Sequence, residues 1–315
     1  MSELPDRLSL REVGPRDGLQ NEAPVPTDGK VALIEALGRT GVRRIEAVSF
    51  VHPRAIPAMA DADAVWSGVH RAPGVRYSAL VANLRGAERA LAAGFTEIET
   101  VVSASATHNR ANVNRSTEQS LDEIAEIIDR AHRQGVTCQV VVATAWGCPY
   151  EGDLAVERVL GVARRAVADG ADALSYGDTT GMATPTRVTR LVGETRSAMP
   201  GTPLNLHFHN TRGTGLANVL AALQLGVTDF DASVGGLGGC PYAPGASGNI
   251  ATEELVHMVE DMGVSTGVDL EAMIEVAAQA ERLVAHTLPS QVLRAGPRWR
   301  TVPTPGSTTP PDVIG

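Results

Sequence analysis

The stretch LNLHFHNTRGTGLANVLAALQLGVTDFDASV (204–234) predicts a strand, a helix and a second strand. Its two ends, 204–209 and 229–234, are short and rich in apolar and β-branched or aromatic residues. The middle part, GLANVLAALQLG, has helical spacing and ends at a glycine suited to a helix C-cap. Two strands joined by a crossover helix form a parallel βαβ unit, so this stretch predicts a parallel sheet.

The same alternation of strand and helix patterns continues along the chain. Further strands are predicted at 8–13, 43–50, 76–81, 97–104, 137–144 and 173–178, and residues 252–285 predict two additional helices. Eight βα units close a barrel, so the predicted fold class is α/β, a (β/α)8 TIM barrel with extra C-terminal helices. A doubly wound open sheet is the alternative, but REVGPRDGLQNE (11–22) lacks its G-x-G-x-x-G fingerprint.

Composition limits the kind of protein this can be. The 315 residues are 43% hydrophobic and 20% charged, which is typical of a globular protein, and barrels of this length form one domain. We expect one barrel domain over residues 1–290, followed by a mobile Pro/Thr/Gly-rich tail over 291–315. The formal net charge of −9, without a Lys/Arg run, argues against binding to nucleic acid.

The expected location is the cytoplasm. Three cysteines in so long a chain cannot form a disulfide framework, which indicates a reducing compartment. The N-terminal segment MSELPDRLSL has neither a signal-peptide nor a transit-peptide pattern, and no run of about 18 apolar residues occurs. We therefore expect no association with a membrane.

Polar residues stand where the predicted strands end, and such barrels place their active sites at the carboxyl ends of the strands. From the first strand to the last, these residues are Arg16, Asp17, Gln20, Glu46, Asp178, Thr179, His207, His209, Asn249 and Glu253. In a strand, His207 and His209 point to the same face. The pair is either a metal or acid/base site, or two buried polar residues that only hydrogen-bond to their neighbours.

A metal site is the interpretation we favour for the histidine pair. Asp17, His207, His209 and Asn249 together offer one carboxylate oxygen, two imidazole nitrogens and one amide oxygen. That mixture suits an octahedral divalent ion such as Mg²⁺ or Mn²⁺. Zinc stays open as an alternative. Asp231 is expected to support a neighbouring side chain rather than to bind the ion.

The glycine-rich stretch GGLGGCPYAPGASGN (235–249) carries one cysteine, Cys240. Such a stretch can be a simple turn-rich connection, and it lacks a lysine at the P-loop spacing. A glycine-rich loop can also bring a reactive thiol over the barrel mouth, which is the role we expect for Cys240. Cys148 is predicted to be structural, and Cys138 to lie in the core.

Several of these motifs resemble the hydroxymethylglutaryl-CoA lyases, part of a wider group of metal-dependent lyases and synthases on TIM barrels. The resemblance runs from about Leu8 to about Leu288 and rests on VGPRDGLQNE (13–22), IEAVSF (45–50), YGDTTG (176–181), H-x-H at 207 and 209, and GLGGCPYAPGASGNIATEEL (236–255). The last motif is the most specific, because the related synthases lack GGCPY.

The resemblance implies roles for particular residues. Asp17, His207, His209 and Asn249 would hold the divalent ion, while Arg16 would stabilise an enolate oxygen and Cys240 would supply a catalytic thiol. Glu46 and His207 would also take part in catalysis. Arg16, Gln20, Asp178 and Thr179 would contact substrate, and Glu253 and Asp231 would support the metal site.

The implied activity is a retro-Claisen cleavage of 3-hydroxy-3-methylglutaryl-CoA, or of a close 3-hydroxy-3-carboxymethyl acyl-CoA. The products would be acetyl-CoA and a 3-oxo acid such as acetoacetate. One alternative is a condensing synthase of the isopropylmalate or citramalate type, which would be expected to have more C-terminal sequence. Another is a non-catalytic barrel that binds a metal or acyl-CoA. The resemblance also makes a homodimer plausible.

The sequence departs from the family pattern at three positions. The histidine strand of typical members continues as H-x-H-D-T-Y-G-Q, whereas here HFHNTRGT places Asn210 and Arg212 after the histidines. Ala23 replaces a lysine that commonly follows RDGLQNE and lies near the CoA moiety. Basic residues that could replace this lysine are Arg54, Arg110 and Arg115. The departures leave the exact acyl-CoA open.

Overall fold

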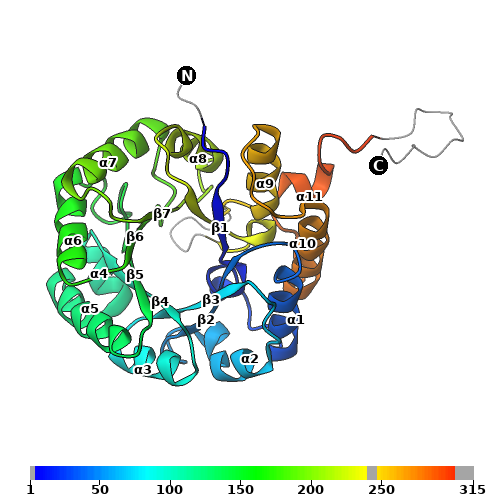
Figure 1. The fold of residues 1–315 in the computed structure, drawn as a ribbon. Helices are drawn as coiled ribbons and strands as arrows, with labels where there is room; N and C mark the ends of the chain where they lie inside the picture. The colour runs from blue at the N-terminus through cyan, green and yellow to red at the C-terminus, as the bar shows by residue number, and fades with distance from the viewer. Residues whose placement is uncertain (1–3, 240–246, 302–315) are drawn as a thin grey trace, which may run out of the picture.

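Eight parallel strands form a closed barrel in chain order in the computed structural model, which describes residues 4–239 and 247–301 (Figure 1). The strands are β1 Ser9–Glu12, β2 Arg44–Phe50, β3 Arg76–Val81, β4 Glu97–Ser103, β5 Thr137–Ala143, β6 Ala173–Gly177, β7 Leu204–His207 and β8 Asp229–Ala232. β1 pairs in parallel with both β2 and β8, which closes the barrel. The predicted TIM barrel is confirmed.

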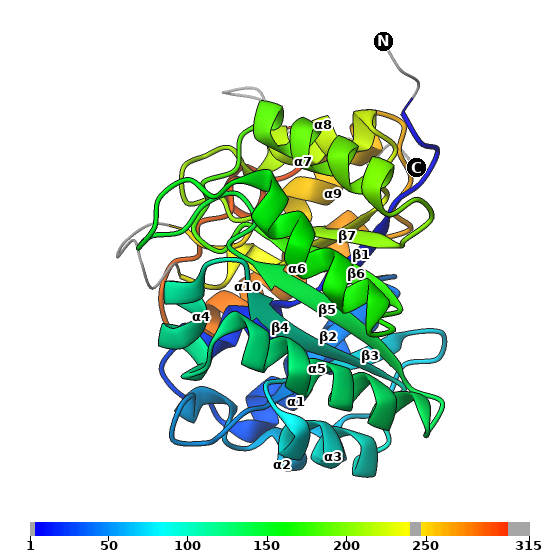
Figure 2. The same cartoon turned by 90° about the vertical axis from the view of Figure 1, so that its left-hand side faces the viewer.

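Helices surround the barrel (Figure 1). They are α1 Thr27–Leu37, α2 Ala62–Gly68, α3 Leu84–Ala92, α4 Ala106–Val113, α5 Thr117–His132, α6 Val156–Ala168, α7 Pro185–Ala198, α8 Gly215–Gln224, α9 Thr252–Asp261, α10 Leu270–Val284 and α11 Gln291–Ala295. Four single turns accompany them, η1 Gly14–Gly18, η2 Leu19–Asn21, η3 Pro57–Met59 and η4 Val234–Gly236. Because α4 directly follows β4, it lies at the carboxyl end of the barrel (Figure 2).

Helix α5 shows how local sequence and packing agree. Ser116 and Gln119 form a capping box at its start, which is worth about 1 kcal/mol. Leu121, Ile124 and Ile128 recur at helical spacing and are all buried against the barrel. Propensity, capping and burial therefore favour the same helix.

Strand β7 is shorter than the predicted strand over 204–209. It ends at His207, and His209 instead forms an isolated antiparallel bridge with Asn249. The reason is a pairing with the segment before α9, in which Asn210 N donates to Gly248 O at 2.6 Å. His209 is therefore placed by this bridge and not by strand alternation.

The helices α2 and α4 were not among the predicted barrel helices, and α11 lies inside the segment assigned to the tail. Residues 302–315 of that tail lie outside the described residues, so the division into domain and tail stays a prediction. None of the helices in the described part of the chain is long and apolar enough to cross a membrane. The cytoplasmic location also stays a prediction.

Candidate active site

Three potential metal ligands meet at the carboxyl end of the barrel. Asp17 from η1, His207 from the end of β7, and His209 place their ligand atoms within 4.8 Å of one another. The two histidine Nε2 atoms lie 3.1 Å apart, and His207 Nε2 lies 4.0 Å from Asp17 Oδ2. Residues that are far apart in the sequence therefore direct their ligand atoms to the same place in the barrel mouth.

The turn η1 is shaped by its glycines. Three successive backbone N–H groups after Pro15 donate to the carbonyl oxygen of Val13, at 2.7 to 3.2 Å. A Cβ on Gly14 would lie 2.7 Å from the Glu12 carboxylate, and one on Gly18 would lie 2.8 Å from a neighbouring side chain. Only glycine fits these close approaches. The turn thereby directs its two charged residues into the barrel mouth.

Asn249 completes the candidate ligand set. Its Nδ2 donates to Asp17 Oδ2 at 2.8 Å and to the Leu237 carbonyl at 2.9 Å. Its Oδ1 is buried and has no hydrogen-bond partner among the described residues. A buried amide oxygen without a partner is costly. Beside Asp17 and the histidines, such an oxygen suits a divalent cation, so the residues fit the predicted metal.

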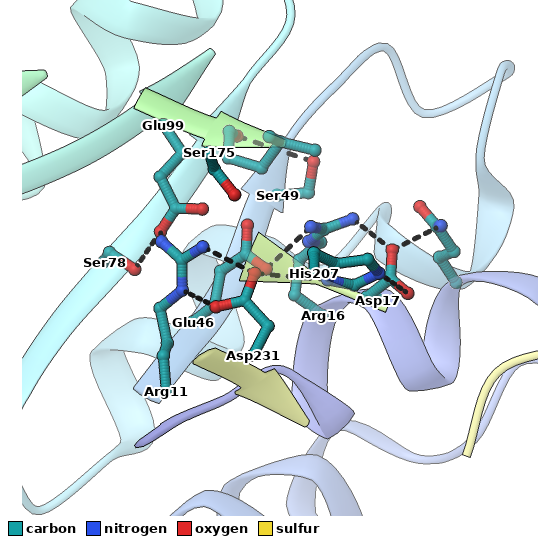
Figure 3. A network of polar contacts seen from close by, with 12 residues as sticks. Arg11, Arg16, Asp17, Glu46, Ser49, Ser78, Glu99, Ser175, His207 and Asp231 are labelled. Carbon is teal, nitrogen blue, oxygen red and sulfur yellow. Dashed lines mark hydrogen bonds and ion pairs between the residues drawn. The ribbon is translucent and has the colours of Figure 1, made fainter. Parts of the chain in front are cut away.

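The charges inside the barrel also favour a cation. The buried charged groups around the site are two guanidinium groups and four carboxylates: Arg11, Arg16, Asp17, Glu46, Glu99 and Asp231 (Figure 3). The carboxylates outnumber the guanidinium groups, and burying an unpaired charge costs several kcal/mol. A bound cation would offset this excess of carboxylates.

His207 is oriented by a second carboxylate. Its Nδ1 lies 3.1 Å from Asp231 Oδ2, and both oxygens of Asp231 accept hydrogen bonds from Arg11 at 2.8 Å. Burial alone would raise the pKa of Asp231, but the charge and hydrogen bonds of Arg11 together with those of His207 outweigh it and lower that pKa. Asp231 therefore stays ionised and fixes the imidazole so that Nε2 faces the shared point.

The other two ligands carry pKa values suited to binding a cation. Burial would raise the pKa of Asp17, but the charges of Arg16 and the two histidines, together with the hydrogen bond from Asn249, outweigh it and lower the pKa to about 2. Burial, reinforced by His207, lowers the pKa of His209 to about 3. The carboxylate is thus ionised and the His209 imidazole neutral, as metal ligands must be.

Arg16 lies between two carboxylates (Figure 3). Its guanidinium group is 2.7 Å from Asp17 Oδ1 and 2.7 Å from Glu46 Oε2. Glu46 is fully buried, and burial raises its pKa well above the ordinary value despite the opposing charge of Arg16. The two contacts hold the guanidinium group rigidly at the cavity wall.

A cavity of about 570 Å³ opens at this site. Predicted residues that line it are Arg16, Asp17, Gln20, Thr179, His207, His209 and Asp231. Gln20 Nε2 donates to Asp17 Oδ1 at 3.0 Å, and Thr179 Oγ1 accepts from the Thr144 N–H at 3.0 Å. Leu80, Val101 and Val141 from β3, β4 and β5 form an apolar part of its wall.

Helix α4 contributes further lining residues, above all His108. His108 is 3% exposed, and burial lowers its pKa. Its position after a predicted strand was a usable signal, because residues after strands surround the mouth of such a barrel.

Among the predicted residues that do not line the cavity, Asp178 and Glu253 hold loops near it. Asp178 Oδ1 accepts from the N–H groups of Met182 and Ala183 and so holds the turn after β6, while burial raises its pKa to about 6. Glu253 accepts from the Gly235 N–H at 3.0 Å, and burial raises its pKa to about 7. The structure thus places both as supports of loops, and the expected substrate contact of Asp178 has no support from the geometry.

Cys240 lies outside the described residues, so its role stays a prediction. The residues that flank the undescribed segment, Gly239 and Ser247, pair in an antiparallel bridge, and Gly239 lines the cavity. Cys138 and Cys148 are both buried, and burial raises the pKa of the Cys138 thiol to about 12. These two positions agree with structural roles.

The departures after the histidines tie loops together. Asn210 Oδ1 accepts from the N–H of Gly215, the first residue of α8, at 3.1 Å. Arg212 Nη1 donates to the carbonyl oxygens of Thr180 and Gly181, at 2.5 and 3.2 Å. Both side chains therefore bond to backbone groups of neighbouring loops, rather than to the candidate metal ligands.

An eight-stranded parallel barrel with an Asp-His-His cluster at its mouth defines a TIM-barrel enzyme of the kind that carries out chemistry at its strand ends. Residues 7–279 match the HMGL-like family. The chain belongs to this family, as its motifs predicted.

Similar proteins agree with this assignment. The chain is 46% identical to the hydroxymethylglutaryl-CoA lyase YngG of Bacillus subtilis, over 92% of this chain and 97% of that protein. It is 43% identical to the (R)-citramalyl-CoA lyase of Chloroflexus aurantiacus, over 94% and 97% of the two chains. An HMG-CoA lyase from Acinetobacter baumannii, solved with coenzyme A and 3-methylmalate, is 44% identical with a TM-score of 0.92, over 97% and 100% of the chains.

Proposed function

We propose that this protein is a divalent-metal-dependent lyase that cleaves 3-hydroxy-3-methylglutaryl-CoA, or a close 3-hydroxy-3-carboxymethyl acyl-CoA. The products are acetyl-CoA and a 3-oxo acid, acetoacetate for the first substrate. One observation carries the proposal, namely that Asp17, His207 and His209 converge beside Arg16 in one cavity. The 46% identity to a hydroxymethylglutaryl-CoA lyase supports the same substrate class.

The reaction sets three tasks for the site. A proton must leave the tertiary hydroxyl group, the bond between C2 and C3 must break, and its electron pair must pass into the enolate of the acetyl thioester. A proton then returns to the C2 carbon of that enolate. Each step moves negative charge, so fixed positive charge and well-placed proton carriers are what the protein has to supply.

The residues that would hold the ion are Asp17, His207, His209 and Asn249. When bound, Mg²⁺ or Mn²⁺ would act as a Lewis acid that lowers the pKa of the substrate hydroxyl group. Asp231 keeps His207 oriented for this role, because it accepts a hydrogen bond at Nδ1. Gln20 supports Asp17 from the other side.

Arg16 is suited to stabilise the thioester enolate oxygen. Its guanidinium group keeps its charge at any working pH and offers planar donors. Glu46 fixes one edge of that group at 2.7 Å, so the remaining donors need little reorganisation when charge develops. We assign Arg16 and Glu46 to catalysis in these two roles.

Proton transfer to or from the substrate is the role we assign to Cys240. A thiol can act as an acid toward the enolate carbon or as a base toward the hydroxyl group. The sequence GGLGGCPY places this cysteine next to Gly239, which lines the cavity. Thr179 also lines the cavity and is assigned to substrate contact.

One experiment tests the function. The purified protein, supplied with Mg²⁺ or Mn²⁺, is incubated with a panel of 3-hydroxyacyl-CoA thioesters that includes hydroxymethylglutaryl-CoA and citramalyl-CoA, and acetyl-CoA release is followed. Release that stops on chelation and returns with the metal supports the proposal. No release from any member of the panel refutes it. Citramalyl-CoA is included because the (R)-citramalyl-CoA lyase is 43% identical to this chain.

A further inference from the structure

Two valines inside the barrel, Val101 on β4 and Val141 on β5, are only partly buried. Their neighbours along the two strands are at most 1% exposed, whereas the valines line the cavity. They are register partners on adjacent strands, so their side chains lie side by side. Apolar surface that faces a cavity in this way is typical of a site that binds an apolar group of a ligand.

Leu80 and Ala143 extend this apolar surface. Leu80 lies on β3, and Ala143 lies two residues beyond Val141 on β5, where a side chain points to the same face of the strand. Both line the same cavity as the valines. We call Leu80, Val101, Val141 and Ala143 the aliphatic wall.

The aliphatic wall lies at the level of the candidate metal ligands. Val141 pairs with Ser175 of β6, while His207 on β7 pairs with Gly177, two residues further along β6. Eight-stranded barrels of this kind shift by about one residue per strand, and alternate strands supply the side chains of one layer. The two-residue shift from β5 to β7 therefore puts Val141 and His207 in one layer of the barrel interior.

Gly177 leaves the space between these two side chains open. It lines the cavity, and a Cβ built on it would lie 3.8 Å from Cγ1 of Val141. The valine side chain therefore points toward backbone that carries no side chain. A substrate group bound beside His207 can reach Val141 across this glycine.

Charged side chains bound the aliphatic wall on the deeper side. Glu99 precedes Val101 by two residues on β4 and forms an ion pair with Arg11 from across the barrel (Figure 3). Two residues of a strand span about 7 Å. The apolar region is thus one layer deep, which suits a short alkyl group, because a long chain would reach the charged layer.

Hydroxymethylglutaryl-CoA would use little of this wall. Its C3 carbon carries a hydroxyl group, a carboxymethyl group, the thioester arm and one methyl group, and the methyl group is the only apolar substituent. The proposed function places the hydroxyl group at the metal ligands and the thioester oxygen at Arg16. The fourth substituent is then the group that can contact the aliphatic wall, and a methyl group is small for a surface of four aliphatic side chains.

We propose that the aliphatic wall binds an alkyl group larger than methyl at C3 of the substrate, with about two to four carbon atoms to fit one layer of the barrel. The inference rests on the proposed function, which fixes the orientation of C3. The substrate class is then the 3-hydroxy-3-alkylglutaryl-CoA thioesters, and the products are acetyl-CoA and a 3-oxo acid that carries the same alkyl group. Val101 and Val141 determine this specificity.

The test compares thioesters that differ only in the alkyl group at C3. Acetyl-CoA release is measured for the methyl, ethyl, propyl and butyl members. We expect kcat/KM of the parent protein to rise about 4-fold for each methylene group from methyl to propyl, since each buries further apolar surface. Val141→Phe fills the space beside Gly177 and should lower the propyl-to-methyl ratio of kcat/KM about 10-fold. Val141→Ala should raise the butyl-to-propyl ratio.

Val142→Ala is the matched control. Val142 lies next to Val141 but on the opposite face of β5, where it is fully buried and does not line the cavity. This change should lower stability and leave the propyl-to-methyl ratio of the parent.

A binding measurement separates the wall from the reaction. The 3-alkylglutaryl-CoA analogues lack the hydroxyl group and cannot be cleaved, and calorimetry should show their affinity rising with alkyl length in the parent but not in folded Val141→Phe. Cleavage of the methyl member in preference to the ethyl and propyl members would overturn the proposal, as would an affinity that does not rise with alkyl length. If no member is cleaved, the lyase function is refuted and the binding series alone decides the role of the wall.

Discussion

Replacing Asp231 with asparagine should weaken metal binding without rebuilding the site. Asp231 is not one of the candidate metal ligands. It accepts a hydrogen bond from Nδ1 of His207, which is a candidate ligand, at 3.1 Å. Asparagine keeps the shape of the side chain and removes its charge. The imidazole then loses the partner that fixes its tautomer and raises the basicity of Nε2. The expected effect is therefore on affinity for the ion and, through it, on kcat.

The structure also sets the size of the effect. Loss of such a partner typically lowers metal affinity 10–100-fold, or about 1.4–2.7 kcal/mol. Asp231 also pairs with Arg11, which is 2% exposed, and breaking a buried ion pair costs about 3–5 kcal/mol of stability. Arg11 keeps Gln139 as a partner at 2.9 Å, so we expect the lower end of that range.

Mn²⁺ titration of the folded variant, together with urea unfolding, separates the two effects. The control is Asp229→Asn on the same strand, where the carboxylate is 40% exposed and lies 3.3 Å from Arg44. An exposed pair contributes under about 1 kcal/mol, so this control should bind Mn²⁺ as the parent does. If folded Asp231→Asn binds Mn²⁺ with parental affinity, the orienting role of Asp231 is wrong.

Three further predictions concern the loops around the site. Glu253→Gln should change the pH dependence of stability. Because the folded pKa of about 7 exceeds the ordinary 4.5, the stabilising contribution of Glu253 is complete below pH 4.5 and is lost as the pH rises to 7. Between pH 4.5 and 8, the unfolding free energy of the variant, measured with urea, should fall by up to about 3 kcal/mol less than that of the parent. A variant with the same pH profile as the parent would contradict the argument that burial raises this pKa. Asn210→Ala should cost about 1 kcal/mol in unfolding free energy, since it removes the hydrogen bond to Gly215, at unchanged KM and Mn²⁺ affinity. A large change in KM would instead place Asn210 in the substrate site. Cys240→Ala should lower kcat by at least about 100-fold with Mn²⁺ affinity retained, as measured by acetyl-CoA release, and undiminished release would exclude the thiol from proton transfer.

The strands were the elements of the fold that the sequence predicted best. Their β-branched runs recur between helical segments, and all eight predicted strands occur with ends shifted by few residues. The end of β7 could not be predicted from the sequence, because it depends on a hydrogen bond between Asn210 and Gly248, which are far apart in the chain. Helices α2 and α4 were not predicted, because they have only seven and eight residues, which is too few to show a clear helical period of apolar residues.

The candidate site could be predicted where its residues stand at the ends of strands. Because TIM barrels place their active sites at the carboxyl ends of the strands, the sequence pointed to Asp17 and His207, which the structure brings together. It did not select Arg11 and Glu99, because they lie within strands and not after them.

The closure of the barrel between β1 and β8 has a consequence for the order in which the protein matures. Asp17 is made early during translation, whereas Asn249 is made more than 200 residues later. A nascent chain on the ribosome therefore cannot present the full ligand set until the last strand has joined the first. An ion captured at this seam would link the two ends of the barrel, so metal supply should influence the yield of finished enzyme as well as its rate.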